Sequence, residues 1–320
     1  MRDVPEPTVD AGQVLVRARS VGICGTDRSI YQGTTPVDHP RILGHEVVGE
    51  VLDASADRSR APGQRVLVDP GIACGACRQC LEGRPNICTH GWLLGRDRDG
   101  GLREMLDVPV DNVHPVPDAI GDDVAPMLQV LATCVHAQRL VPVFVGDRVV
   151  VLGLGVSGLL HVQLAKLRGA APIVGVTRSS DKRVLAERFG ADHTVAADGD
   201  EVEAAREATG GGADLVIECV GSAATFGRAI QMARVGGRVL CYGTITDGAE
   251  RFPFYDLYYK ELSISNPRSA QPRDFPAAIE LVASGRVALE PLVSRRFDLA
   301  SAGEALAASN AGGLKVLVDL

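Results

Sequence analysis

Four cysteines, Cys74, Cys77, Cys80 and Cys88, fall within fifteen residues of a 320-residue chain that has eight cysteines in all. Residues 69–77 are rich in turn formers, which predicts a loop. A loop that folds back can bring four thiolates to one centre, where tetrahedral zinc fits without an open position. Two disulfides are an alternative, which a reducing cytosol disfavours. An iron–sulfur cluster also uses four cysteines, though with other typical spacings. The spacing favours structural Zn²⁺, in a lobe of about residues 70–90.

Further potential metal ligands lie earlier in the chain. Cys24 stands in a glycine-containing turn after an expected strand, and His45 and Glu46 stand just before another. Thiolate, imidazole and carboxylate are all zinc ligand types. A single cysteine is usually a core residue and a single histidine a surface residue, so these three indicate a metal site only in combination.

A glycine-rich turn follows an apolar strand and opens a helix. It reads Gly153, Leu154, Gly155, Val156, Ser157 and Gly158. Glycines there allow a tight turn, close approach of a pyrophosphate and close helix–strand packing, while the helix N-terminus supplies free N–H groups. Glycines also mark ordinary turns, but a strand before, a helix after and a strand–helix array beyond predict a dinucleotide site.

The end of the second strand of that array selects the dinucleotide. An NAD site usually has Asp or Glu there, whereas this chain has neutral Thr177 followed by Arg178, Ser179 and Lys182. Arginine and serine can bind the 2′-phosphate of NADP, which an acidic residue would repel. The alternative is an ordinary solvated helix start. The residues favour NADP over NAD.

The elements that position these residues fall into two patterns. From about residue 147 strands and helices alternate, which predicts an α/β fold with a doubly wound parallel sheet. The expected strands are 147–152, 172–177, 193–195, 214–219 and 237–242, and the expected helices are 156–168, 180–189, 200–208 and 222–234.

The first third of the chain reads as β structure punctuated by proline and glycine. We expect strands within 12–25, broken at Gly22 and Gly25, and near 47–52 and 64–68. Apolar residues at helical spacing predict a helix over 123–140. A further helix at 274–284 and a last strand at 315–318 follow the array.

Composition excludes several classes of protein. The chain is 46% hydrophobic, too apolar for a disordered protein. Its net charge of −7, without a basic cluster, excludes a duplex-binding surface. No apolar run approaches the roughly 18 residues of a membrane span, and residues 1–7 hold no signal-peptide core. We therefore expect a cytoplasmic protein with no nucleic-acid or membrane partner.

In combination these motifs resemble the zinc-dependent medium-chain dehydrogenases, over essentially the whole chain. The motifs that carry the resemblance are residues 22–27, 44–46, the four-cysteine lobe, 153–158, 214–221 and 236–239. The resemblance implies a GroES-like β catalytic domain, residues 1–128 and 267–320, and a Rossmann cofactor domain, residues 129–266. It implies hydride transfer between NAD(P) and a secondary alcohol or polyol, or its ketone.

The resemblance also implies roles for single residues in a catalytic zinc site. Cys24 and His45 would ligate zinc, Glu46 would be a ligand or lie beside it, and Thr26 would start the proton relay. The third ligand position of the family falls on Gln129, a weaker neutral donor. Where many members carry a relay histidine, this chain has Ser29.

Further residues are assigned to cofactor binding on the same basis. They are Cys219, Val220 and Gly221 after a strand of the cofactor domain, and Lys315 before the last strand, where the alternative is a solvated lysine. Residues 252–259 hold five aromatic side chains, expected in the core or at a subunit contact of a homodimer or homotetramer.

Two other functions stay open at this point. A zinc-independent NADPH enone reductase uses the same fold but lacks the cysteine and histidine ligands. A non-catalytic, zinc-depleted member would fit Gln129, Ser29 and a family strand that is expected before residue 2 and is not in this sequence.

Overall fold

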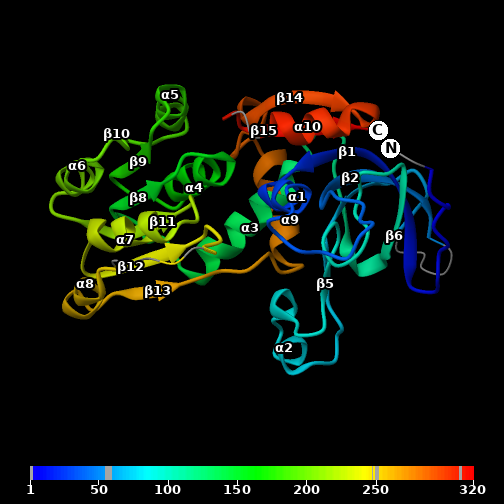
Figure 1. Ribbon diagram of the computed structural model, residues 1–320, viewed down its shortest axis with the longest axis horizontal. Helices are drawn as coiled ribbons and strands as arrows, with labels where there is room; N and C mark the ends of the chain where they lie inside the picture. The colour runs from blue at the N-terminus through cyan, green and yellow to red at the C-terminus, as the bar shows by residue number, and fades with distance from the viewer. Residues whose placement is uncertain (1–2, 55–59, 247, 249–251, 310–311) are drawn as a thin grey trace. The chain divides into compact units, whose positions relative to one another are not determined.

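The structure is a computed structural model that describes residues 3–54, 60–246, 248, 252–309 and 312–320. It divides into two compact units: unit 1 is Met1–Thr133 with Ser269–Leu320, and unit 2 is Cys134–Arg268. The domain boundaries predicted from the sequence, at 128/129 and 266/267, lie a few residues before these divisions. Figure 1 shows the chain, with labels on most of its helices and strands.

Unit 1 is built on a seven-stranded sheet in the order β14-β15-β1-β2-β3-β7, with β6 also paired to β1. Its strands are β1 (Gln13–Ile23), β2 (Glu46–Asp53), β3 (Arg65–Val68), β6 (Met105–Pro109), β7 (Val113–Pro115), β14 (Val293–Asp298) and β15 (Lys315–Asp319). Valines from β1, β2, β3, β6 and β7 fill its core. β-Branched residues suit this position because they pack well on a pleated, half-buried surface.

Short elements complete unit 1. They are α1 (Gly25–Tyr31), the two-stranded pair β4 (Gly71–Ile72) and β5 (Trp92–Leu93), α2 (Arg78–Leu81), α9 (Asp274–Ala283) and α10 (Ala302–Ala308). The four-cysteine segment is therefore more than a loop, because one helical turn, α2, lies between its second and fourth cysteines.

The expected break of the first strand at Gly22 is wrong. β1 runs unbroken to Ile23, and Gly22 pairs with Glu46 in the antiparallel register of β1 and β2. Glycine weakens a strand interior, but here pairing on both sides, with β2 and β15, holds the backbone extended.

Unit 2 contains a six-stranded sheet in the order β10-β9-β8-β11-β12-β13. Every pairing in it is parallel. Its strands are β8 (Val149–Leu152), β9 (Ile173–Thr177), β10 (His193–Ala196), β11 (Ala213–Glu218), β12 (Ala233–Cys241) and β13 (Ser263–Ser265). In chain order this is 3-2-1-4-5-6, the arrangement of doubly wound dinucleotide-binding sheets. The predicted α/β class is confirmed.

The connecting helices are α4 (Val156–Leu167), α5 (Ser180–Arg188), α6 (Glu201–Ala208), α7 (Ala223–Met232) and α8 (Phe254–Tyr259). α3 (Met127–Leu140) spans the division between the units. Two helix ends differ from expectation by two residues or more. α3 begins at Met127 rather than at 123, because the preceding segment forms turns closed by backbone bonds to Gly121. α7 ends at Met232, because Ala233 already pairs with Ala213 as a strand.

No helix in the described part of the chain is long and apolar enough to cross a membrane.

Candidate functional site

Strand pairing brings Cys24, His45 and Glu46 together in unit 1. Cys24 follows the end of β1 and is the N-cap of α1, while Glu46 opens β2, the neighbouring strand. The Cys24 sulfur, a His45 ring nitrogen and a Glu46 carboxylate oxygen all lie within 4.8 Å of one another. A thiolate, an imidazole and a carboxylate at this separation are a set that one zinc ion can bind.

Gly22 makes room for Glu46. A Cβ atom at Gly22 would lie 2.1 Å from Oε2 of Glu46, far inside any real contact distance. Because the two residues are direct cross-strand partners, any side chain at position 22 would displace the carboxylate. The glycine that the sequence suggested as a strand break is thus a requirement of the site.

Asp27 organises the cluster, although no role for it was predicted from the sequence. Its two carboxylate oxygens accept N–H bonds from Cys24 and Gly44, each at 2.9 Å, and Oδ1 lies 3.3 Å from Nδ1 of His45. The side chain is fully buried. A carboxylate against one ring nitrogen leaves the other nitrogen free as a metal ligand, which is the usual support of ligating histidines. Its place three residues after Cys24, as the N3 acid of a helix start, was the available signal.

Lys315 is buried, not solvated, and it neutralises Glu46. Its ammonium donates to both carboxylate oxygens of Glu46, at 2.7 and 2.6 Å, and to the carbonyl oxygen of Ile23 at 3.2 Å. Lys315 is 5% exposed and Glu46 1%. These three bonds use all three ammonium hydrogens. Any help that Lys315 gives to a bound cofactor would therefore come from its charge.

Without a metal, the charges of the cluster favour a thiolate at Cys24 and a protonated ring at His45. Burial raises the pKa of Cys24, but the nearby positive charge of His45 outweighs it and the net pKa is lowered, which favours the thiolate. Burial lowers the pKa of His45, but Asp27 and the Cys24 thiolate outweigh it and hold that pKa well above its usual value. A dication bound between thiolate and imidazole replaces the proton they share.

The remaining residues predicted for this site lie on two helices. Thr26 is half-buried on α1, and its carbonyl oxygen accepts from the hydroxyl of Ser29 at 3.0 Å. The Ser29 hydroxyl also accepts from Thr35. Gln129 is buried, 8% exposed, in the first turn of α3. Its role as the third zinc ligand stays a prediction.

The four cysteines of the lobe converge as predicted, and all are free thiols. Sulfur–sulfur distances are 3.5 Å for Cys77–Cys80, 3.7 Å for Cys77–Cys88 and 3.4 Å for Cys74–Cys88. Four Zn–S bonds of about 2.3 Å at tetrahedral angles place sulfurs about 3.8 Å apart. The set therefore fits a tetrahedral zinc ion, and the disulfide alternative is wrong.

Backbone N–H groups prepare the lobe for a cation. Backbone N–H bonds from Ala76 and Cys77 lower the pKa of Cys74. Backbone N–H bonds from Cys80 and Thr89 lower the pKa of Cys77 to about 5. Burial among neighbouring thiols raises the pKa of Cys80 to about 12. Four thiolates so close repel one another, and a dication supplies the charge that lets all four ionise.

The glycine turn in unit 2 fits a dinucleotide. Gly153 has φ +95°, and a Cβ there would lie 2.6 Å from Cγ2 of Val220. A Cβ at Gly158 would lie 1.9 Å from the Gly153 carbonyl, so α4 packs tightly on β8. At Gly155, the N-cap of α4, a Cβ would meet nothing within 4 Å. That open side at a helix N-terminus is where a pyrophosphate can approach the backbone.

The residues predicted to select NADP surround the end of β9. Thr177 is its last residue, Arg178 is exposed, and Ser179 caps α5 through a bond from the Lys182 N–H at 3.4 Å. Burial lowers the pKa of Lys182. No acidic residue follows Thr177 until Asp181 in the first turn of α5.

Glu218, the last residue of β11, shapes the loop of Cys219, Val220 and Gly221. Its Oε1 accepts N–H bonds from Val220 at 2.8 Å and Gly221 at 2.9 Å. The loop in turn packs on Gly153, so the fully buried Glu218 links two predicted cofactor segments. Glu218 lies in the 214–221 motif, but no role for it was predicted from the sequence. A carboxylate at a strand end just before a glycine turn was the signal.

Comparison with known families and structures assigns the same two regions. Residues 10–118 match the family "Alcohol dehydrogenase GroES-like domain", and residues 156–284 match "Zinc-binding dehydrogenase". A sorbitol dehydrogenase from Halalkalibacterium halodurans is 31% identical over 326 residues, covering 99% of this chain and 94% of that protein.

Two solved structures are similar over nearly the full length. A zinc-binding dehydrogenase from Sinorhizobium meliloti 1021 bound to NADP is 38% identical, with a TM-score of 0.92 and coverage of 100% of this chain and 95% of the other. An alcohol dehydrogenase from E. coli CFT073 complexed with NADH is 28% identical, with a TM-score of 0.91 and coverage of 100% and 94%.

Proposed function

The chain belongs to the zinc-dependent medium-chain dehydrogenases, and from that premise we propose an NADP-preferring enzyme that interconverts a secondary alcohol or polyol and its ketone. It is an oxidoreductase that transfers a hydride between NAD(P) and an alcohol or ketone. The observation that carries the proposal is the Cys24, His45 and Glu46 donor set in a chain that also holds an open glycine turn. The enone reductase and non-catalytic alternatives are not favoured by these relatives.

The protein's own residues prepare the alcohol for hydride transfer. Zinc held by Cys24 and His45, with Gln129 as the proposed third ligand, would supply a Lewis acid that lowers the pKa of the substrate hydroxyl. Asp27 holds the His45 ring in place, and Lys315 neutralises Glu46, so that its carboxylate does not repel a developing alkoxide. Thr26 would take the hydroxyl proton and pass it outward.

The glycine turn would hold the cofactor so that its nicotinamide receives the hydride. The N–H groups at the start of α4 would bind the pyrophosphate, and Glu218 keeps the Cys219–Gly221 loop in position against Gly153. Fixing both reactants in this way removes most of the entropy cost of bringing them together.

The cofactor preference rests on the end of β9. Exposed Arg178 and the Ser179 hydroxyl offer donors to a 2′-phosphate, and Thr177 offers no carboxylate to the ribose of NAD. Arg178→Gln should raise the KM for NADP by roughly 10- to 100-fold and leave the KM for NAD unchanged, because a bidentate arginine–phosphate pair is worth roughly 1.5–3 kcal/mol. Arg188→Gln, at the exposed far end of α5, is the control. A wild-type enzyme that prefers NAD would overturn the assignment.

The substrate class is tested by a screen with both cofactors. Zinc-loaded protein is assayed against simple secondary alcohols, polyols and polyhydroxy acids, and bound zinc is counted in parallel. We expect about two zinc ions per chain, one tetrahedral and closed, one with an open position. Activity with secondary alcohols or polyols supports the proposal. Full zinc occupancy without oxidation of any alcohol would contradict it.

We also propose that the protein is a homo-oligomer in the cytoplasm. Four aromatic side chains of α8, Phe254, Tyr255, Tyr258 and Tyr259, are 63–82% exposed, so the core alternative is wrong for them. β13, at the edge of the parallel sheet, follows α8. Large exposed aromatic patches beside an unpaired strand edge favour self-association. Eight free cysteines favour a reducing compartment.

A further inference from the structure

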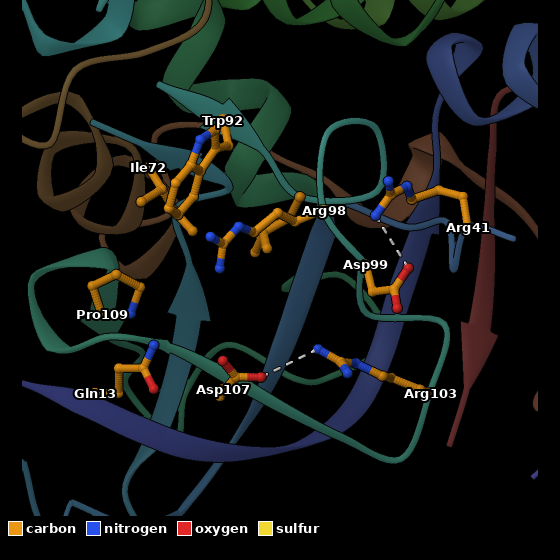
Figure 2. A pocket seen from close by; sticks show the side chains of 10 residues that line it. Gln13, Arg41, Ile72, Trp92, Arg98, Asp99, Arg103, Asp107 and Pro109 are labelled. Carbon is orange, nitrogen blue, oxygen red and sulfur yellow. Dashed lines mark hydrogen bonds and ion pairs between the residues drawn. The ribbon is translucent and has the colours of Figure 1, made fainter. Parts of the chain in front are cut away.

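A cavity of about 250 Å³ lies in unit 1 and is lined by none of the zinc or cofactor residues described above. It lies at the base of the four-cysteine lobe, between the β4–β5 pair and the chain from Leu94 to Pro109. Its walls carry three arginines, Arg41, Arg98 and Arg103, against two aspartates, Asp99 and Asp107, so its formal charge is positive (Figure 2). The zinc sites and the cofactor site described above do not involve this cavity.

Arg98 is an exposed cation that stacks on Trp92 and has no counter-ion among the described residues. Its guanidinium carbon lies 3.4 Å from the centroid of the Trp92 ring, and Figure 2 shows the group extending into the pocket beneath Trp92. Within the described chain no carboxylate forms an ion pair with it. A guanidinium stacked on an indole is held in one orientation and keeps the N–H donors at its edge free. Anion binding there costs little side-chain entropy.

The other two arginines are only partly satisfied. Arg41 Nη1 lies 3.4 Å from Asp99 Oδ1, an oxygen that already accepts the Ile42 N–H at 3.0 Å. Arg103 Nη2 lies 3.6 Å from Asp107, beyond hydrogen-bond length. The Nε atoms of Arg41 and Arg103 are buried and have no hydrogen-bond partner. The terminal nitrogens of the two side chains, each in one long contact with a carboxylate, are the donors that a ligand oxygen could engage.

The pocket is preformed by the backbone. The loop that carries Arg98 and Asp99 is tied to the segment before His45 by N–H bonds from Gly100 to Ile42 and from Gly101 to Gly44, both 2.8 Å. The pocket's shape therefore does not depend on a flexible loop closing. Its volume is below the roughly 300–1,000 Å³ of sites for drug-sized ligands, so the occupant is small.

We propose that this cavity is a binding site for a small oxyanion, phosphate or carboxylate, with Arg98 as its main ligand. Arginine's planar fork matches two oxygens of either group. Asp99 and Asp107 disfavour a highly charged polyanion, because they reduce the net formal charge of the cavity lining to +1.

Trp92 provides a direct readout because it is the chain's single tryptophan. Zinc-loaded protein saturated with NADP⁺, which occupies the cofactor's own anion site, is titrated with inorganic phosphate and, separately, with succinate. Sodium chloride at matched ionic strength is the control. We expect a saturable change in tryptophan fluorescence with phosphate, succinate or both, and the two titrations show which oxyanion binds more tightly.

Arg98→Gln should weaken the response about tenfold or more, a loss of one charge-assisted bidentate contact. Arg98→Lys keeps the charge but not the fork and should fall between wild type and Arg98→Gln. Arg96→Gln is the matched control, because Arg96 lies in the same loop, pairs with Asp97 and does not line the cavity. It should bind as wild type does.

The proposal is overturned if the phosphate and succinate curves follow the chloride curve, or if Arg98→Gln and Arg96→Gln respond alike. The fluorescence signal needs no turnover. A protein that binds the oxyanion but oxidises no alcohol would contradict the proposed function and support this site. A protein that oxidises alcohols but binds no oxyanion would support the proposed function and contradict this site.

Discussion

The four-cysteine lobe takes all its sulfurs from fifteen consecutive residues, whereas the Cys24 cluster takes its donors from two segments that meet only when β1 pairs with β2. The lobe's Cys74 is exposed, and backbone N–H groups lower the pKa of Cys74 and Cys77. In the Cys24 cluster, His45 and Glu46 are buried, and side chains from three parts of the chain balance the charge. A local site thus needs only a turn, while an assembled site needs a sheet register and two buried counter-charges, Asp27 and Lys315.

This contrast implies that the two sites are independent of each other. The lobe's geometry depends on its own loop, and the lobe residues make none of the hydrogen bonds that hold Cys24, His45 and Glu46. Its anchor to the rest of unit 1 includes a bond from Gln271 to Asn86, at 3.0 Å. Each site can therefore be disabled while the other is counted.

The largest expected effect separates the sites by their metals. Cys24→Ser should lower bound zinc from about two to about one per chain. It should also lower kcat/KM by roughly a thousandfold or more, because Lewis-acid stabilisation is worth several kcal/mol. Cys77→Ser should also lose one zinc, but with loss of stability as the main result. Metal analysis and kinetics check both, and loss of both metals in either variant would show that the sites are coupled.

The next effect tests the buried ion pair. Lys315→Met leaves Glu46 buried without its counter-charge and should lower the free energy of unfolding by about 3–5 kcal/mol. Adding Glu46→Gln should restore most of that loss. Lys166→Met is the control, because its exposed pair with Asp192 should contribute less than about 1 kcal/mol. Denaturant unfolding measures all of these, and equal losses for the two lysine variants would refute the assignment.

A pH-dependent effect is expected at the base of the lobe. Burial raises the pKa of Asp69 to about 7. The hydrogen bond from the Gly71 N–H acts in the opposite direction but does not cancel the effect of burial. An unfolded aspartate ionises near 3.9, so the folded state binds more protons between about pH 4 and 7, and stability falls as pH rises through that range.

Asp69→Asn should remove that slope. At roughly 1.4 kcal/mol for each pH unit, its gain in stability at pH 8 is at most about 4 kcal/mol, with little gain at pH 4. Asp111→Asn, an exposed neighbour, should leave the slope unchanged. Denaturant unfolding curves measured between pH 4 and 8 give the free energy of unfolding at each pH. If its dependence on pH is the same in Asp69→Asn as in wild type, the pKa of Asp69 is not raised.

The smallest expected effect concerns the orientation of His45. Asp27→Asn should weaken zinc binding or lower activity by about 10- to 100-fold, as loss of a carboxylate behind a ligating histidine usually does. The lobe zinc should stay. Asp38→Asn, exposed after α1, is the matched control. If the Asp27→Asn variant retained zinc as well as wild type in competition with a chelator, Asp27 would have no role in supporting the zinc ligand His45.

Much of the fold could be predicted from local patterns. Apolar strands and amphipathic helices alternate regularly after residue 147, and the parallel sheet follows from that alternation. The errors lie where tertiary pairing overrides a local signal. Gly22 reads as a break but continues β1, and Ala233 reads as helix but joins β12. The aromatic side chains of α8 were expected in the core or at a subunit contact, and all four are exposed, which leaves the subunit contact as a prediction.

The sequence by itself determined the four-cysteine lobe, the glycine turn and the zinc-ligand types, because each depends on residues close together in the chain. Only the tertiary structure decided that Asp27 supports His45, that Lys315 neutralises Glu46 and that Arg98 stacks on Trp92 in a charged cavity. The physical reason is range: backbone turns act over a few residues, whereas buried charges take their partners from any segment that the folded chain brings within about 4 Å.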